Sequence, residues 1–380
     1  MGALESDVCV VGAGIVGLAH ALEARARGLT VTVVERHERA VGASVRNFGH
    51  VIVSGMAAGE PLRVALAARQ RWLELGRRAG LAVLESGSLI VAREPDELEL
   101  LEAVAADPAR RARMLDRRRT AELAPIPCEG LLGALHCELD VRVDPRQAVA
   151  ALAALLEADD DARVLWRTRV HEVHDGGAET SAGPIRAPLV IVCPGPDHDW
   201  LAGVLAPARP GLTRCKLQML RVRAPWGRAC RPALLTGLSL LRSLGFSERP
   251  GADRLAARLA DQVPEIVRAG IHVIVTQLPG GDLLIGDTHE YGSTVSPFGD
   301  ERLDELVLAQ ACRLLGAERL DVVQRWHGVY PSAPGDPFLI ERPLPGVAIV
   351  EIVAGIGMTT ALGLAPRTFA ELGEPVAAAT

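Results

Sequence analysis

Residues 7–35 constrain the fold of this chain more than any other segment. They read as an apolar strand, a turn that carries Gly12, Gly14 and Gly17 in the spacing GxGxxG, an amphipathic helix, and a second strand that ends at Glu35. The first glycine permits the tight turn, the second lets a pyrophosphate approach the backbone, and the third lets the helix pack closely on the strand. The segment predicts a dinucleotide-binding βαβ unit with the phosphates at the helix N-terminus.

The acidic residue at the end of the second strand narrows the choice of dinucleotide. Glu35 follows Gly17 at the distance where a carboxylate can accept hydrogen bonds from both ribose hydroxyls. The same carboxylate would repel the 2′-phosphate of NADP. A second strand–turn–helix pattern, at 346–365, has only Gly355 and Gly357 in its turn. The chain is therefore expected to hold one dinucleotide.

The remaining patterns indicate two domains. Helices are expected over 95–107 and 144–158, and strands over 162–174 and 187–195. Residues 211–325 read as strands joined by turns, with one helix near 251–269, which is typical of an antiparallel sheet. Because the cofactor-binding pattern occurs at both ends, we expect a discontinuous cofactor domain (1–84, 144–213 and 323–380) and an inserted substrate domain (85–143 and 214–322).

Charge and composition exclude several classes of function. The formal net charge of −6 argues against a dedicated nucleic-acid or anionic-membrane binder. Glu5 and Asp7 stand where a secretory signal would have basic residues, so we expect a cytoplasmic protein. The seven cysteines have no CxxC spacing, and His171 and His174, three apart on a strand, point to opposite faces. We therefore expect no metal site.

The chain resembles the FAD-dependent amine and amino-acid oxidase superfamily, which contains D-amino-acid oxidase, glycine oxidase and monomeric sarcosine oxidase. The motifs that carry the resemblance are VVGAGIVG (10–17), GASVRNFG (42–49), RVDP (142–145), VCPG (192–195), RWHGVYP (325–331) and AGIGMT (354–359). Further motifs are similar to a branch proposed to oxidise aminophosphonates related to 2-aminoethylphosphonate, namely SVRNFG (44–49), CKLQML (215–220), GIHVIVTQ (270–277) and GDTHEYG (286–292).

The resemblance implies an α/β fold in which a Rossmann-like FAD-binding domain carries an inserted, mainly antiparallel substrate domain. FAD is expected to be non-covalent, because Pro331, Ser332 and Ala333 stand where sarcosine oxidases carry the attached cysteine. The residues implied to bind FAD are Gly12, Gly14, Ile15, Val16, Gly17, Glu35, Arg36, Ser44, Arg46, Asn47, Val170, Gly195, Gly355, Ile356, Gly357, Met358 and Thr359.

The implied reaction is hydride transfer from the carbon beside a neutral amine to flavin N5, which gives an imine that water hydrolyses. The residues expected to anchor an anion or wall the substrate are Arg46, His50, Lys216, His289, Tyr291, Trp326 and Tyr330. Each has an alternative: FAD phosphate binding for Arg46, a loop role for His50, a strand-end role for His289 and Tyr291, and core packing for the other two aromatics. Lys216 shares a strand face with Gln218, which is either the site or solvent.

We therefore expect an enzyme that oxidises a C–N bond of a small amine, with an aminophosphonate as first substrate. Leu284 and Thr359 align where sarcosine oxidases carry lysines that activate oxygen and hold a carboxylate, so the electron acceptor is oxygen or another molecule. The alternatives are an amino-acid oxidase acting on glycine, sarcosine or a D-amino acid, an NAD(P)H-dependent flavin hydroxylase, and a non-catalytic flavoprotein.

Overall fold

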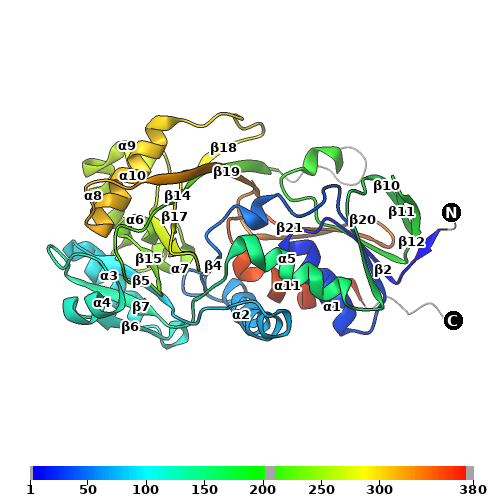
Figure 1. Ribbon diagram of the computed structural model, residues 1–380, viewed down its shortest axis with the longest axis horizontal. Helices are drawn as coiled ribbons and strands as arrows, with labels where there is room; N and C mark the ends of the chain where they lie inside the picture. Colours follow the sequence, from blue (N-terminus) through cyan, green and yellow to red (C-terminus); the bar gives the residue numbers. More distant parts are fainter. Residues whose placement is uncertain (1–2, 202–209, 374–380) are drawn as a thin grey trace.

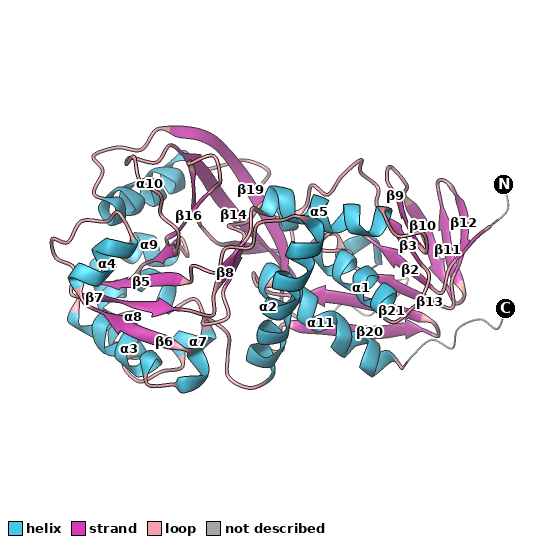
Figure 2. Ribbon diagram, turned by 60° about the horizontal axis from the view of Figure 1, so that its bottom comes forward, coloured by secondary structure: helices cyan, strands magenta, loops and turns pink. Residues whose placement is uncertain are grey.

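The computed structural model describes residues 3–201 and 210–373, which form two lobes (Figures 1 and 2). One lobe is built on a six-stranded sheet with the order β20-β21-β13-β2-β3-β9. All neighbours pair in parallel except β20 with β21. The strands are β2 (Val8–Val11), β3 (Val31–Val34), β9 (Ala162–Leu165), β13 (Leu189–Val192), β20 (Phe338–Leu344) and β21 (Val347–Ile352).

This first sheet is covered on both faces, which explains its continuous apolar strands. Val8 and Val10 of β2 contact one core cluster and Cys9 and Val11 contact another. Four helices pack together on the first face: α1 (Ile15–Ala26), α2 (Glu60–Ala79), α5 (Pro145–Glu157) and α11 (Gly357–Leu372). A four-stranded sheet covers the second face and contains β1 (Leu4–Glu5), β10 (Val170–His174), β11 (Gly177–Thr180) and β12 (Gly183–Arg186).

The second lobe is built on a nine-stranded sheet, mainly antiparallel, with the order β18-β14-β17-β16-β15-β5-β7-β6, and β19 also pairs with β14. Its strands are β5 (Ser88–Ala92), β6 (Ala112–Leu115), β7 (Gly133–Cys137), β14 (Thr213–Val222), β15 (Ala233–Leu235), β16 (Ile274–Gln277), β17 (Leu283–Gly286), β18 (Glu290–Gly292) and β19 (Val322–Ser332).

Helices cover both faces of this large sheet. The first face carries α9 (Pro264–Arg268) and α10 (Glu301–Leu315). The second face carries α3 (Pro95–Ala105), α6 (Gly237–Leu240), α7 (Leu244–Ser247) and α8 (Ala252–Gln262). The smaller elements are α4 (Arg117–Leu123), a two-stranded sheet of β4 (His50–Val51) and β8 (Val141–Arg142), and the short turns η1 (Ala43–Val45), η2 (Pro108–Arg110) and η3 (His198–Leu201).

The α/β fold with a parallel sheet is confirmed, and three segments differ in detail from the expectation. Residues 162–174 are not one strand, because β9 joins the parallel sheet and β10 joins the four-stranded sheet. Residues 211–325, expected to hold one helix near 251–269, contain α8 and α9 there and also α6, α7 and α10. Helix α2 was not among the expected elements, although its C-terminus carries Gly80 in the left-handed conformation typical of a helix end.

The division into cofactor and substrate domains stays a prediction. The boundary placed at residue 323 assigns β19 to the cofactor domain, whereas β19 pairs with β14 along its length. Among residues 3–201 and 210–373, no helix has the length and hydropathy needed to cross a membrane.

Candidate functional site

The predicted dinucleotide turn has the close approaches that require glycine. Gly12 has a φ of +104°, and a Cβ there would lie 2.6 Å from the Cys193 carbonyl oxygen. A Cβ on Gly17 would lie 1.9 Å from the Gly12 carbonyl oxygen, so any side chain would separate helix α1 from the turn. Gly14 is the N-cap of α1 and provides no side-chain cap. These glycines leave the N-terminus of α1 accessible to a phosphate.

Glu35 lies beside this turn, at the end of β3. Its two carboxylate oxygens accept hydrogen bonds from the backbone N–H groups of Ala13 and His37, each at 3.0 Å. The Glu35 carbonyl accepts from Thr168 N–H at 2.9 Å, which brings the segment before Val170 alongside. The carboxylate predicted to bind ribose and the strand predicted to contact adenine are therefore neighbours. Arg36, next in sequence, pairs with Asp197.

The GASVRNFG segment closes the other side of the turn. Ser44 Oγ accepts from Ile15 N–H at 2.9 Å, which ties η1 to the start of α1. The Asn47 side-chain amide donates to the carbonyls of Ala43 and Ser44 at 2.9 Å each. Arg46 extends to the large sheet, where its guanidinium donates to the His327 carbonyl at 3.1 Å. The cradle fits a dinucleotide, because it offers helix N-terminal N–H groups, a carboxylate at the end of β3 and glycines where bulk would clash.

The second glycine segment begins α11 next to this cradle. Gly355 and Ile356 precede the helix, and Ile356 is its N-cap. Thr359 is buried and accepts a hydrogen bond from Ile52 N–H at 3.1 Å. The Met358 carbonyl accepts from Trp72 Nε1 at 2.8 Å, which fixes α2 against α11. Gly195, after β13, has a φ of +60° and no atom within 4 Å of a Cβ. Val16 and Gly357 lie in the first turns of α1 and α11.

Two tyrosines lie above the start of α11. Tyr330 of β19 and Tyr291 of β18 occupy the register positions on either side of Cys215 in β14. Both tyrosines neighbour Cys215, and burial raises the pKa of this thiol to about 11. The Tyr330 hydroxyl oxygen lies 3.2 Å from the position of a Cβ on Gly355. Trp326 lies on the same face, opposite Met219, and its indole N–H donates to the Arg46 carbonyl at 3.4 Å.

Arg242 completes this group and was not among the predicted site residues. It follows α6, and its Nη2 donates to the Tyr291 hydroxyl at 2.7 Å. Burial raises the pKa of the neighbouring Tyr330 hydroxyl well above its usual value, so this phenol stays protonated. The site therefore combines one cation with two phenols, an arrangement that suits an anionic group. No motif marks Arg242 in the sequence, because it lies in an irregular connection.

Lys216 lies on the opposite face of β14. Its ammonium is buried and donates to the Phe298 carbonyl at 2.5 Å and to Glu290 at 3.1 Å. Gln218, on the same face, contacts Asp300 and Asp304 near α10. The structure thus separates Lys216 from the tyrosines and gives its charge two protein partners. A substrate-anchoring role for Lys216 stays a prediction.

His50 is buried in strand β4, which pairs with β8. Its Nε2 is 3.7 Å from Asp140, and neither ring nitrogen has a hydrogen-bond partner among the described residues. Asp140 is held by Ser54, whose N–H and hydroxyl donate at 2.8 and 2.7 Å, and by the hydroxyl of Ser88. His50 is therefore placed beside a fixed carboxylate, and its substrate role stays a prediction.

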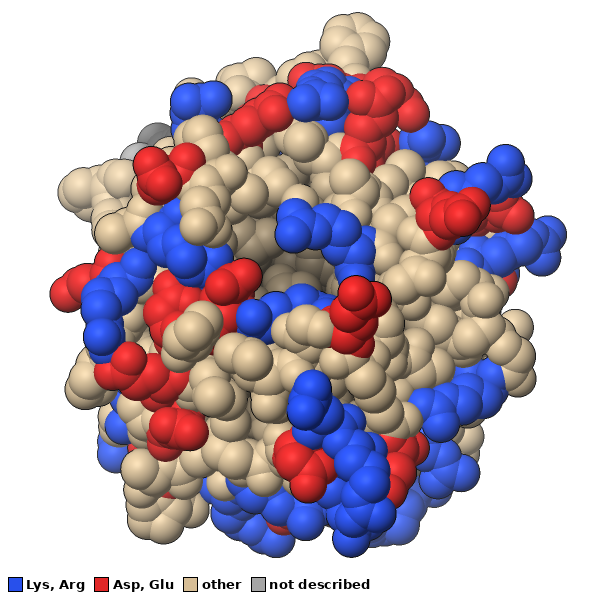
Figure 3. All heavy atoms as spheres, turned by 90° about the vertical axis from the view of Figure 1, so that its left-hand side faces the viewer, with Lys and Arg blue, Asp and Glu red and all other residues tan. Residues whose placement is uncertain are grey.

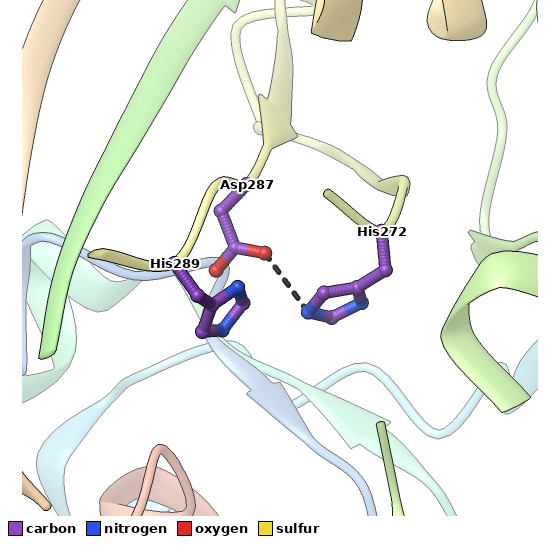
Figure 4. Close-up of side chains that lie close together, drawn as sticks. All are labelled: His272, Asp287 and His289. Atoms are coloured by element: carbon purple, nitrogen blue, oxygen red, sulfur yellow. Dashed lines mark ion pairs between the residues drawn. The ribbon is translucent and has the colours of Figure 1, made fainter. Parts of the chain in front are cut away.

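His289 belongs to a compact group with His272 and Asp287 (Figure 4). Burial lowers the pKa of His289 to about 3, so its imidazole is neutral. Burial opposes ionisation of Asp287, but neighbouring groups, above all His272, outweigh it and lower the pKa of the carboxyl group. His289 stacks on Tyr291 with 6.3 Å between ring centroids. Sequence motifs contained His272 and Asp287 without marking them as site residues.

Charged side chains of both signs are interspersed over the face of the large-sheet lobe, and Lys or Arg borders a hollow there (Figure 3). An open pocket of about 540 Å³ near α4 is lined by Arg117, Arg118, Ala121, Glu122, Cys128 and Arg228. Arg118 pairs with Glu122 inside this pocket at 3.6 Å. The pocket is lined by none of the residues that form the dinucleotide cradle or the tyrosine pair.

The chain matches the family model described as FAD dependent oxidoreductase over residues 7–370. It is 31% identical over 293 residues to the tRNA 5-methylaminomethyl-2-thiouridine biosynthesis bifunctional protein MnmC of Ralstonia nicotianae, covering 70% of this chain and 43% of the relative. It is also 30% identical over 180 residues to glycerol-3-phosphate dehydrogenase 1 of Mycobacterium bovis, covering 42% of this chain and 34% of the relative. The chain thus spans less than half the length of these curated relatives.

Solved structures share the fold over nearly the whole chain. L-proline dehydrogenase from P. horikoshii superposes with a TM-score of 0.78 at 19% identity, covering 97% of this chain and 93% of that one. Glycine oxidase from Geobacillus kaustophilus superposes with a TM-score of 0.75 at 21% identity, covering 98% and 96%. Iminodiacetate oxidase from Chelativorans sp. BNC1 gives 0.73 at 19% identity, covering 98% and 97%.

Proposed function

The chain belongs to the FAD-dependent oxidoreductase family, and on that premise we propose that it oxidises a C–N bond of a small amine that carries an anionic group. When bound, FAD supplies the electron acceptor for the carbon next to the amine nitrogen. The observation that carries the proposal is the position of Tyr330, whose hydroxyl lies against Gly355 at the start of α11 and shares Cys215 with Tyr291.

The protein's own groups have separate tasks in this proposal. The turn at Gly12–Gly17 and Glu35 hold the nucleotide half of FAD, while residues 355–359 border the flavin. Arg242 and Tyr291 bind the substrate's anion, and the buried Tyr330 phenol orients the amine end. Tyr330 is partly buried among apolar side chains, which strengthens its polar contacts.

An aminophosphonate related to 2-aminoethylphosphonate is the proposed substrate class. A phosphonate offers up to three oxygens to a guanidinium and a phenol, whereas a carboxylate offers two. The relatives supply two partial precedents: MnmC is named for a methylaminomethyl product, and the mycobacterial dehydrogenase is named for a phosphate-bearing substrate. The proposed electron acceptor is oxygen or another small oxidant, and the proposed location is the cytoplasm.

An amino-acid substrate is the second candidate, supported by the likeness to structures titled glycine oxidase and iminodiacetate oxidase. An anaerobic titration of the purified holoprotein separates the candidates. The FAD absorbance is followed while 2-aminoethylphosphonate, its N-methyl derivative, glycine, sarcosine, D-alanine and NADPH are added in turn.

Bleaching by the phosphonates alone supports the proposal. Bleaching by the amino acids alone assigns the second candidate. Bleaching by NADPH indicates a nicotinamide-dependent hydroxylase, and a flavin that no compound reduces indicates a binding protein; both results contradict amine oxidation.

A further inference from the structure

His272, Asp287 and His289 form a side-chain cluster that the proposed oxidation does not use (Figure 4). His272 and Asp287 are backbone partners: Asp287 N–H donates to the His272 carbonyl at 2.8 Å, and His272 N–H donates back at 3.3 Å. The two imidazoles are stacked with 5.2 Å between their centroids. One ligand atom from each of the three residues lies within 4.8 Å of the others.

The Asp287 carboxylate is unusual because it is buried and incompletely paired. Asp287 is 4% exposed. Its Oδ1 forms an ion pair with His272 Nε2 at 2.9 Å, but none of the described residues donates a hydrogen bond of regular geometry to Oδ1. A buried carboxylate oxygen without a hydrogen bond is costly unless a cation compensates it. The lone pair of Oδ1 is therefore available in the same space as the His272 nitrogen.

Each of the two imidazoles has a polar partner at its Nδ1 atom. His289 Nδ1 lies 2.8 Å from the Gly270 carbonyl and donates to it, which leaves Nε2 with its lone pair. His272 Nδ1 lies 3.4 Å from Ser239 Oγ, and the Ser239 hydroxyl donates to the Val273 carbonyl at 3.2 Å. In metal sites, a ligating histidine usually has its second ring nitrogen bonded to a carbonyl or another polar group in this way.

We propose that His272, Asp287 and His289 bind a divalent transition-metal ion. Two imidazoles and one carboxylate form a donor set that suits Zn²⁺ or Fe²⁺ and leaves at least one coordination position open. Bonds of about 2.0–2.2 Å place tetrahedral ligands around one ion about 3.3–3.6 Å apart, so the side chains need to close by up to about 1.5 Å. The site is a feature of this chain and does not depend on the substrate proposed above.

The surroundings indicate what such an ion does. Arg242 adds a positive charge near Asp287, and Tyr291 stacks on His289. The loaded site is therefore net positive and adjoins the Arg242–Tyr291 pair. An anionic group bound at that pair would be drawn to both cations; this last step rests on the proposed function, whereas metal binding itself does not.

The test measures metal binding by the full-length holoprotein without substrate. After treatment with a chelator and dialysis, the protein is equilibrated with Zn²⁺, or with Fe²⁺ under anaerobic conditions, and the bound metal is counted by mass spectrometry. We expect about one equivalent to bind with micromolar or tighter affinity. Asp287→Asn and His289→Gln should each weaken binding by about 10- to 100-fold or more, with FAD absorbance unchanged.

His174→Gln is the matched control, because His174 also lies near a carboxylate, 3.8 Å from Glu179, on the distant strand β10. It should retain wild-type binding. If Asp287→Asn fails to fold, Ser239→Ala keeps the test informative, since removal of the support of His272 should weaken binding by about tenfold. Binding of no ion by the wild-type protein, or equal affinity in the wild-type and ligand variants, overturns the proposal without affecting the amine titration.

Discussion

The Tyr330 hydroxyl oxygen lies 3.2 Å from the point where a β carbon on Gly355 would stand. This relationship joins the large sheet to the N-terminus of α11, because Tyr330 belongs to β19 and Gly355 precedes the helix. Tyr330, which we propose faces the substrate, is thereby placed against the loop that we assign to the flavin. The predictions below test the groups arranged around this contact.

Arg242→Met should raise the KM for the anionic substrate about 10- to 100-fold, because a charge-assisted hydrogen bond contributes about 1.5–3 kcal/mol. FAD content should stay unchanged. Lys216→Met is the comparison, since Lys216 lies on the other face of β14 with Phe298 and Glu290 as partners. Steady-state kinetics measure the KM of both variants. A KM that is raised only in Lys216→Met would show that the anion binds on the Lys216 face of β14.

Glu35→Ala should weaken FAD retention by about tenfold or more, because the ribose loses its acceptor and Ala13 N–H loses its partner. The measurement is free flavin after ultrafiltration at a fixed protein concentration. Glu38→Ala, at an exposed position that pairs with Arg39 and Arg167, is the control. Full occupancy in Glu35→Ala would remove Glu35 from the cofactor site.

Gly17→Ala should destabilise the fold by about 3 kcal/mol or more, since its new methyl group would lie 1.9 Å from the Gly12 carbonyl oxygen. The drop should appear in thermal unfolding of the protein with and without FAD. Gly227→Ala meets no atom within 4 Å and should unfold near the wild-type temperature. A Gly17→Ala protein with wild-type stability would show that the turn is less tightly packed than described.

Glu351→Gln should stabilise the protein at pH 7.5 and have little effect at pH 4.5. Burial raises the pKa of Glu351 to about 8, and both carboxylate oxygens lack hydrogen-bond partners among the described residues. A raised folded-state pKa means that stability is present below the unfolded value of 4.5 and is lost as the pH rises towards 8.

The difference for Glu351→Gln reaches up to about 4 kcal/mol at pH 7.5, at about 1.4 kcal/mol for each pKa unit. Urea unfolding at the two pH values measures it. Glu172→Gln, at an exposed position of strand β10, is the control. Equal stabilisation by Glu351→Gln at both pH values would show that the carboxyl group does not titrate within this range.

Local patterns were sufficient for the dinucleotide turn and for several helices and strands, although they missed α2 and the break between β9 and β10. Residues 8–11 form a parallel strand that is buried on both faces. The glycines of the GxGxxG turn make the close contacts that their spacing predicts. The approach of Gly17 to Gly12 and the pairing of β2 with β3 depend on contacts within about thirty residues of sequence. The helices at 95–105 and 145–157 begin with proline in the first turn, which is a local signal.

The substrate face could not be predicted in this way, because its neighbours come from distant strands. The side of β14 that carries Lys216 was ambiguous until pairing with β18 and β19 placed Tyr291 and Tyr330 next to Cys215. Arg242 reaches Tyr291 from a connection between two short helices. Likewise, His272 and Asp287 meet only because the chain returns at β17 alongside β16.

Strand β19 is shared between the two halves of the molecule in a way that limits their relative movement. It pairs with β14 in the large sheet, and just beyond its end Ala333 N–H donates to Val353 next to β21. Val353 N–H in turn donates to the Pro337 carbonyl. Strand β19 therefore connects the large sheet to the parallel sheet. We expect ligand exchange to proceed through side-chain and loop rearrangement and not through hinged opening of the two lobes.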